Sequence, residues 1–239
     1  MDLADFRVLS FDCYGTMIDW ETGIMAQIRP WLAGRGVAVS DVEILQAFGQ
    51  TESAEEEAAP DALYPIILER VHGRLAARWG LLADEEAAVR FGGSVERWPP
   101  FPESHEALTR LKQRYRLVIL SNVDRRSFSK SQQQLDVDFD AIYTAEDIGS
   151  YKPDPRNFDH LLEAERAAGY RRREILHVGQ SLFHDHVPAT NAGIATCWIQ
   201  RPTLAGDHGA AQPPASRPRV DFHFRSLTEL AEEAGLSTP

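Results

Sequence analysis

The chain has 239 residues, 43% of them hydrophobic and 26% charged, a composition typical of a folded globular protein rather than a disordered one. Its formal charge of −11 at pH 7 argues against general binding to nucleic acids or anionic membranes, but not against a small anionic substrate, which responds to local fields. With only two cysteines, no signal peptide and no apolar run long enough to span a membrane, we expect a cytoplasmic protein without a disulfide framework.

The first predicted element is a short buried strand over residues 6–12, with the sequence FRVLSFD. From about residue 20 to residue 98, apolar residues recur at spacings of three and four and no strand signal is present, so this block is predicted to be all-helical. Its helices are expected at residues 21–36, 40–59, 61–80 and 83–98. The block ends at WPPFP, residues 98–102, where three prolines end any helix and mark a linker.

Capping residues support these helix limits. Ser40 and Asp84 are suited to N-caps, and Gly36 and Gly80 are suited to helix ends. The acidic run Glu55 to Glu57 is interpreted as a solvated helix face without a chemical role.

Beyond residue 100, predicted helices and strands alternate. Strands are expected at residues 116–123, 139–145, 174–180 and 194–200, and helices at 104–115, 127–137, 157–169 and 184–193. This alternation predicts right-handed βαβ units and a parallel sheet covered on both faces. The strand at 6–12 must join that sheet, because alone it cannot bury its apolar sides. A Gly-, Pro- and Ala-rich loop is expected at 204–220.

The predicted fold class is therefore α/β. We expect a doubly wound, Rossmann-like parallel-sheet core made of residues 1–18 and 100–239, with an inserted all-helical cap at residues 19–99.

Polar side chains follow the strands of the predicted sheet. Ligands of such sheets bind outside the carboxyl ends of the strands. The residues just past four strand ends are Asp12, Tyr14, Thr16, Ser121, Asn122, Lys152, Gln180, Ser181, His184 and Asp185. Each of them alone has a structural explanation, such as capping a turn or a helix. Their convergence on one crevice favours a shared functional site.

This arrangement closely resembles the haloacid dehalogenase-like (HAD) hydrolase superfamily over essentially the whole chain. The motifs are DCYGT at residues 12–16, Ser121 in ILSNV, Lys152 in YKPDP, and VGQSLFHD at residues 178–185. A helical cap inserted after the first motif also fits. The resemblance implies covalent catalysis, in which the nucleophile Asp12 forms an aspartyl ester or phosphate that water then cleaves.

The resemblance assigns roles to the polar residues past the strands. It makes Asp12, Thr16, Lys152 and Asp185 catalytic, and we expect the Lys152 ammonium to bridge both carboxylates. We further assign substrate binding to Tyr14, Ser121, Asn122, Gln180, Ser181 and His184. His184 could be a base or a halide or carboxylate contact, but it could equally cap the following helix or face solvent.

Two positions favour a dehalogenase over a phosphatase. The phosphatases carry a second Asp two residues after the nucleophile, which protonates an alkoxide leaving group; here the residue is Tyr14, and a halide leaves without a proton. They also carry an Asp that ligates Mg²⁺ where this chain has Gln180, whose neutral amide is a much weaker ligand. The resemblance therefore points to the type II L-2-haloacid dehalogenase branch, which cleaves the carbon–halogen bond of a small 2-haloalkanoic acid without a metal.

Two alternatives stay open at this point. One is a phosphatase of a small phosphate ester with Asp185 holding Mg²⁺, the only case in which a cofactor is expected. The other is a non-catalytic binding protein on the same fold. The expected partner is a small anionic molecule, with no nucleic acid and no membrane, and a homodimer is compatible with the resemblance.

The cap departs from the dehalogenases that the chain resembles. Those enzymes use a cap Arg to bind halide and carboxylate, whereas the corresponding residues 47–60 contain no Arg, which leaves Arg29, Arg70 and Arg74 as substitutes. Phe158 also stands where they have a Tyr, six residues after the catalytic Lys.

Overall fold

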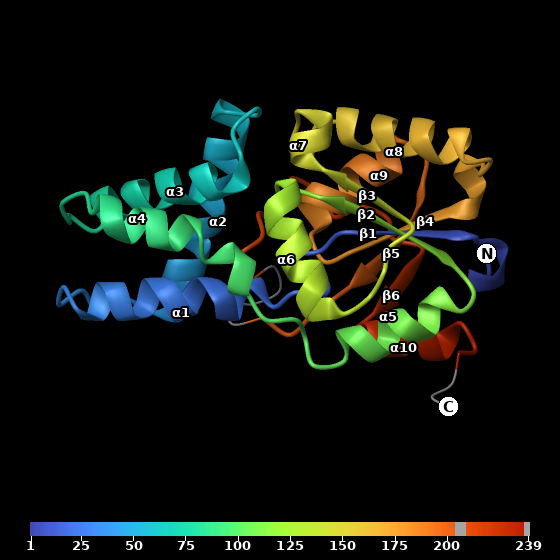
Figure 1. Cartoon of the computed structure of the whole chain (residues 1–239), viewed down its shortest axis with the longest axis horizontal. Coiled ribbons are helices and arrows are strands. Elements are labelled where there is room, and N and C mark those ends of the chain that lie inside the picture. Colours follow the sequence, from blue (N-terminus) through green and yellow to red (C-terminus); the bar gives the residue numbers. More distant parts are fainter. Residues whose placement is uncertain (204–208, 237–239) are drawn as a thin grey trace.

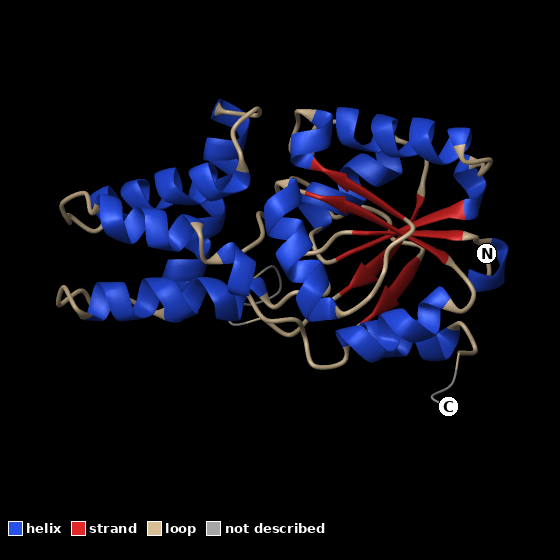
Figure 2. Cartoon of the chain, viewed as in Figure 1, coloured by secondary structure: helices blue, strands red, loops and turns tan. Residues whose placement is uncertain are grey.

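The computed structural model describes residues 1–203 and 209–236 and has an α/β fold built on one parallel sheet (Figure 2). The described residues contain six strands in the order β3-β2-β1-β4-β5-β6. They are β1 (Val8–Phe11), β2 (Arg116–Ser121), β3 (Ala141–Thr144), β4 (Ile175–Gly179), β5 (Ala195–Ile199) and β6 (Phe222–Phe224). The predicted Rossmann-like α/β core is confirmed, and β1 lies between β2 and β4 as a central strand.

Both faces of the sheet are covered by helices, which explains why β1 is buried along its whole length. Leu9 and Phe11 pack in one apolar cluster with α5 (Ser104–Lys112) and α10 (Leu227–Glu233). Val8 points to the opposite face and packs in a second cluster, with residues of α8 (Arg156–Ala167) and α9 (Val187–Asn191). Figure 1 shows these two helical layers on opposite sides of the sheet.

Residues 20–92 form four helices that lie beside the carboxyl end of the sheet (Figure 1). We call them the cap helices: α1 (Trp20–Ala33), α2 (Asp41–Ala58), α3 (Tyr64–Arg78) and α4 (Glu85–Gly92). Ser40 and Asp84 cap α2 and α4 as predicted, because their side chains accept hydrogen bonds from the N–H groups of Glu43 and Ala87. Within the described ranges, no helix has the length and apolar character needed to cross a membrane.

Two adjacent chain segments join the cap helices to the core. The Asp19 N–H donates to the Pro99 carbonyl at 2.8 Å, and the Phe101 N–H donates to the Met17 carbonyl at 3.0 Å. The proline-rich segment predicted as a linker therefore runs antiparallel to the segment after β1, with a bridge between Ile18 and Pro100.

The second half of the chain differs from the prediction in several places. The helix expected at 184–193 is confirmed only in part: a π-helical turn, Leu182–His186, comes first, and α9 follows it. Such π turns often occur at functional sites. β6, α7 (Ala145–Ile148) and α10 were not predicted at all. Of the loop expected at 204–220, residues 209–220 are irregular as predicted, and 204–208 lie outside the described residues. The remaining α-helix of the described residues is α6 (Arg125–Leu135).

Candidate active site

Asp12 follows β1 directly and is held in a fixed position by its neighbours. Its backbone N–H donates to the Val178 carbonyl at 3.0 Å, which continues the pairing of β1 with β4. Thr16 Oγ1 donates to Asp12 Oδ2 at 2.7 Å and accepts from the Gln180 N–H at 2.9 Å. Thr16 is thus a buried support for the Asp12 carboxylate.

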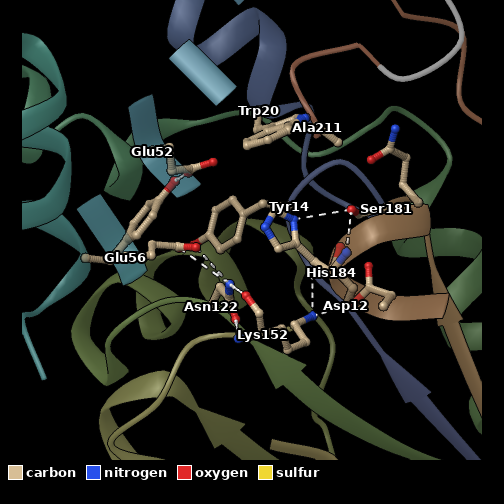
Figure 3. A pocket seen from close by; sticks show the side chains of 13 residues that line it. Asp12, Tyr14, Trp20, Glu52, Glu56, Asn122, Lys152, Ser181, His184 and Ala211 are labelled. Carbon is tan, nitrogen blue, oxygen red and sulfur yellow. Dashed lines mark hydrogen bonds and ion pairs between the residues drawn. The ribbon is translucent and has the colours of Figure 1, made fainter. Parts of the chain in front are cut away.

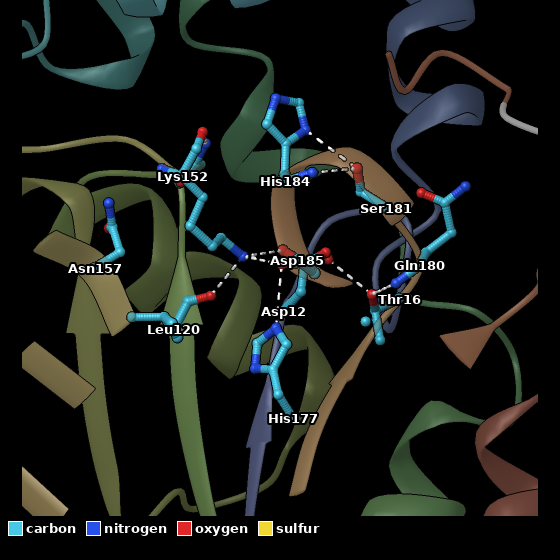
Figure 4. A network of polar contacts seen from close by, with 12 residues as sticks. Asp12, Thr16, Leu120, Lys152, Asn157, His177, Gln180, Ser181, His184 and Asp185 are labelled. Atoms are coloured by element: carbon cyan, nitrogen blue, oxygen red, sulfur yellow. Dashed lines mark hydrogen bonds and ion pairs between the residues drawn. The ribbon is translucent and has the colours of Figure 1, made fainter. Parts of the chain in front are cut away.

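Lys152 joins the two core carboxylates, as predicted (Figure 4). Its ammonium donates to Asp12 Oδ1 at 3.0 Å, to Asp185 Oδ1 at 2.6 Å and to the Leu120 carbonyl at 2.8 Å. An ammonium has three donors, so all of them are engaged. Asn122 fixes the backbone of Lys152 from both sides, because Oδ1 accepts from the Lys152 N–H at 2.7 Å and Nδ2 donates to its carbonyl at 2.9 Å.

The two carboxylates respond differently to this environment. Burial raises the pKa of Asp12 to about 6, with Lys152 opposing the rise and Asp185 adding to it. Burial also acts to raise the pKa of Asp185, but the Lys152 charge and the hydrogen bond from His177 together hold it well below its ordinary value. Burial acts to lower the pKa of Lys152, yet Asp12 and Asp185 raise it overall. At neutral pH the site therefore holds an ionised Asp12 beside a charged lysine.

His177 lies beneath this pair and was not predicted as a site residue. Its Nε2 is 3.2 Å from Asp185 Oδ1, and its Nδ1 is 3.1 Å from Ser10 Oγ. Burial lowers the pKa of His177, so the ring is neutral at pH 7. A neutral ring that donates to Asp185 from Nε2 accepts from Ser10 at Nδ1, which fixes the tautomer. Phe158, which replaces the tyrosine of the dehalogenases, packs edge-on against this ring at 4.9 Å between centroids.

A small pocket opens above Asp12 (Figure 3). Its volume is about 40 Å³, and a single water needs about 10–15 Å³ on the same measure, so it holds a molecule of a few heavy atoms. The lining residues are Asp12, Tyr14, Trp20, Glu52, Glu56, Tyr64, Asn122, Lys152, Gln180, Ser181, His184, Asp185 and Ala211.

Most of the predicted substrate contacts lie in the wall of this pocket, but Ser121 does not. The Ser121 hydroxyl is buried and has no hydrogen-bond partner among the described residues. The Tyr14 hydroxyl is turned toward α6, where it lies 2.8 Å from Ser131 Oγ, and burial raises its pKa well above the ordinary value. His184 contacts Ser181, and burial lowers its pKa to about 4, so its imidazole is neutral at pH 7.

The cap side of the pocket contradicts the interpretation of the acidic run as a solvated face. Glu55 and Glu56 are buried, only Glu57 is exposed, and Glu56 lines the pocket together with Glu52. The reason is helical periodicity: Glu52 and Glu56 lie four and eight residues after the buried Phe48 and share its side of α2.

The three arginines proposed as substitutes for a cap cation do not reach the pocket. Arg29 pairs with Asp41 on the surface, Arg74 is exposed and pairs with Glu55 at 2.9 Å, and Arg70 is exposed. Lys152 is the one lysine or arginine among the lining residues.

Sequence reasoning also missed Trp20 and Tyr64 as lining residues, and the signal for the cap side was present. Leu45, Phe48, Glu52 and Glu56 follow one another at spacings of three and four, so the two glutamates continue an apolar helical face. Charged residues on such a face indicate a pocket.

The position that carries a carboxylate ligand for Mg²⁺ in the phosphatases holds an amide in this chain. Both oxygens of Asp12 are already engaged, by Lys152 and Thr16, and the residue in the usual ligand position is Gln180. Within residues 1–203 and 209–236, no three His, Cys, Asp or Glu side chains are grouped so as to hold a metal.

Known proteins with similar sequences include a dehalogenase and a nucleotidase. Haloacetate dehalogenase H-2 of Moraxella sp. (strain B) is 29% identical over 233 residues, which cover 92% of this chain and 96% of that protein. Pyrimidine 5′-nucleotidase YjjG of Escherichia coli (strain K12) is 33% identical, but over 94 residues, which cover 39% of this chain and 37% of that protein.

Structural and family comparisons agree on the fold. The L-2-haloacid dehalogenase from Xanthobacter autotrophicus, solved with chloropropionic acid covalently bound, superposes with a TM-score of 0.78 at 19% identity, covering 98% of this chain and all of that one. The family model of haloacid dehalogenase-like hydrolases matches residues 6–193. The chain therefore belongs to the haloacid dehalogenase-like hydrolase family.

Proposed function

We propose that the protein is a hydrolytic dehalogenase that cleaves the carbon–halogen bond of a small 2-haloalkanoic acid through an aspartyl ester on Asp12. The observation that carries this proposal is the pairing of a buried, ionised Asp12 with a Tyr14 that cannot act as an acid. The Tyr14 hydroxyl contacts Ser131, and its raised pKa keeps it neutral and weakly acidic. A leaving group that needs a proton finds no donor at this position, whereas a halide needs none.

In the proposed reaction, an Asp12 oxygen attacks the carbon that bears the halogen, and the halide departs with the bonding electron pair. Water then attacks the carbonyl carbon of the Asp12 ester and the ester C–O bond breaks. One proton of the water goes to the departing oxygen of the 2-hydroxy acid, and the other is released to solvent as the Asp12 carboxylate is regenerated. Lys152 and Thr16 hold the attacking carboxylate in place through its two oxygens. No step of this proposed reaction uses a metal ion, since Gln180 offers only a neutral amide at the position of the usual carboxylate ligand.

The size of the pocket and the relatives support this proposal. A volume of about 40 Å³ suits a substrate the size of a haloacetate better than a nucleotide. Haloacetate dehalogenase H-2 matches this chain along nearly its whole length.

The partial similarity to a nucleotidase favours a phosphatase as the second candidate. A phosphate dianion, however, brings two negative charges next to the ionised Asp12, and Gln180 offers only a neutral amide where a carboxylate would bind the Mg²⁺ that offsets this repulsion. A non-catalytic role leaves unexplained why two carboxylates and a lysine are buried together, since replacing such groups by apolar ones is often neutral or stabilising.

Halide release from chloro-, bromo- and fluoroacetate, measured beside hydrolysis of p-nitrophenyl phosphate with Mg²⁺ or with EDTA, separates the three candidates. We expect halide release that EDTA leaves unchanged and no phosphatase activity. Phosphate release that requires Mg²⁺ would establish the phosphatase instead, and inactivity toward all substrates would favour the binding protein.

A further inference from the structure

The cap side of the pocket carries two acids where an anionic substrate calls for a cation. Glu52 and Glu56 are 4% and 5% exposed and line the pocket opposite Asp12 and Lys152 (Figure 3). Glu52 Oε1 accepts from the Tyr64 hydroxyl, and Glu56 accepts from Asn122 Nδ2 at 3.3 Å. Glu52 Oε2 has no hydrogen-bond partner among the described residues and is directed into the pocket.

Among the described lining residues, no positively charged side chain has a hydrogen-bond donor left for a carboxylate. The three protons of the Lys152 ammonium go to Asp12, Asp185 and the Leu120 carbonyl. The described lining of the pocket therefore holds four carboxyl groups and one ammonium. Because the volume of the pocket is only about 40 Å³, an anion bound there lies next to the two glutamates in any orientation.

We propose that Glu52 and Glu56 take the place of a cap cation by binding the substrate carboxylate through a proton that lies between it and the glutamate pair. This assignment rests on the proposed dehalogenase function and specifies how that same site recognises its substrate. A carboxylic acid that donates to a carboxylate forms a short, charge-assisted hydrogen bond, and it removes the repulsion that two ionised glutamates would exert.

The environment of the pair supplies such a proton at neutral pH. Burial raises the pKa of Glu52 to about 7, opposed by the Tyr64 hydrogen bond and helped by Asp12. Burial and the neighbouring Glu52 hold the pKa of Glu56 well above its ordinary value, with Lys152 and Asn122 opposing. The titratable groups that face the pair are Tyr64 from α3, Asp12 and Tyr14 after β1, Tyr151 and Lys152 after α7, and His184 and Asp185 of the π-helical turn.

This mode of binding predicts that the KM for a haloacid depends on pH, whereas the KM for its amide does not. Chloroacetate stays ionised across the working pH range, so its binding needs the proton on the pair and weakens about tenfold per pH unit once the pair ionises. Chloroacetamide has the same shape without the charge, and its NH₂ group donates to an ionised glutamate. We therefore expect the KM for chloroacetate to rise about tenfold or more between pH 7 and pH 9, while the KM for chloroacetamide stays level.

The kinetic test measures halide release from both compounds between pH 6.5 and pH 9, with the Asp12→Asn protein as the blank. In the double variant Glu52→Gln/Glu56→Gln, the KM for chloroacetate should no longer depend on pH, because the remaining cap-side group, Tyr64, has a raised pKa and stays neutral between pH 6.5 and pH 9. Glu57→Gln is the matched control on the same helix: Glu57 is exposed, and the variant should keep the pH dependence of the unaltered protein. Parallel pH profiles for acid and amide in the unaltered protein overturn the inference.

A second measurement needs no turnover and no variant. Calorimetry of glycolate, the hydroxy acid product, binding to the unaltered protein at pH 8.5 in two buffers of different ionisation enthalpy should show uptake of about one proton, and glycolamide should show none. Glycolate affinity that does not increase from pH 9 to pH 6.5, including no binding at either pH, overturns the proposal. Proton uptake without halide release from any haloacetate would instead contradict the dehalogenase function and leave the role of the pair standing.

Discussion

Removing the Lys152 charge tests whether the buried network holds the site together. Lys152→Met keeps much of the side-chain length and its apolar contacts but removes the ammonium. Lys152 is 1% exposed, and it contacts Asp12 Oδ1 and Asp185 Oδ1 at 3.0 and 2.6 Å. The variant leaves these two carboxyl groups buried next to one another with no cation between them.

The expected loss follows from the cost of uncompensated buried charge. Breaking a buried ion pair by removing one partner typically costs about 3–5 kcal/mol, so we expect that loss in the free energy of unfolding at pH 8. Lys152 lowers the pKa of both Asp12 and Asp185, so both pKa values rise in the variant. An acid whose folded pKa is raised favours the folded state at low pH and loses that contribution as pH increases. The deficit of the variant should therefore shrink at pH 5.

Urea unfolding followed by circular dichroism at pH 8 and pH 5 measures both effects, and halide release at pH 8 measures the loss of ionised Asp12. Lys130→Met is the control, because Lys130 is an exposed lysine on α6 and its loss should change neither property. A Lys152→Met protein within about 1 kcal/mol of the unaltered protein at pH 8 would refute the reasoning, as would an equal deficit at both pH values.

Four further outcomes follow from the site. Asp12→Asn should abolish halide release, because an amide is not a nucleophile, while circular dichroism and Tm show an intact fold. Halide release by the unaltered protein should fall below pH 6, since burial raises the pKa of Asp12 to about 6 and the protonated acid does not attack; a rate profile from pH 4 to pH 8 checks this. Tyr14→Asp combined with Gln180→Asp restores an acid and a carboxylate ligand, so it should create Mg²⁺-dependent hydrolysis of p-nitrophenyl phosphate. Glu52→Gln should stabilise the protein at pH 9 by about 1–3 kcal/mol and have little effect at pH 5, because the raised pKa of about 7 makes the ionised form unfavourable in the fold; urea unfolding at both pH values measures it.

The core could be predicted from the sequence because its signals are local. A strand such as residues 8–11 is apolar on both sides, and alternation with helices then requires a parallel sheet. β6 was not predicted because it is three residues long and only partly buried, so it has no pattern that distinguishes it from a loop. The π-helical turn at Leu182–His186 was read as ordinary helix, because periodicity does not separate the two within five residues.

Part of the candidate site could likewise be predicted from the sequence, and part of it could not. Asp12, Lys152 and Asp185 could be placed together because the ends of parallel strands meet at one edge of the sheet. The glutamates of α2 come from a different part of the fold, and their position depends on how the cap helices pack over that edge. Charge suggested that Glu56 faces water, although the helical spacing of Glu52 and Glu56 from Phe48 indicates a buried face; the packing shows that this face meets the pocket.

The described lining of the pocket sets one cation, Lys152, against four carboxyl groups, and this balance of charge limits how many of them can be ionised. Ionising Asp12, Asp185, Glu52 and Glu56 together against Lys152 would leave three uncompensated negative charges in a space of about 40 Å³. The lysine contacts the two carboxyl groups of the core, one of which must be ionised to attack. No described cation contacts Glu52 or Glu56, and burial raises the pKa of both, which favours their protonated forms in the folded protein. In this arrangement Lys152 stabilises the ionised form of the nucleophile Asp12, and recognition of an anion depends on protons bound to Glu52 and Glu56.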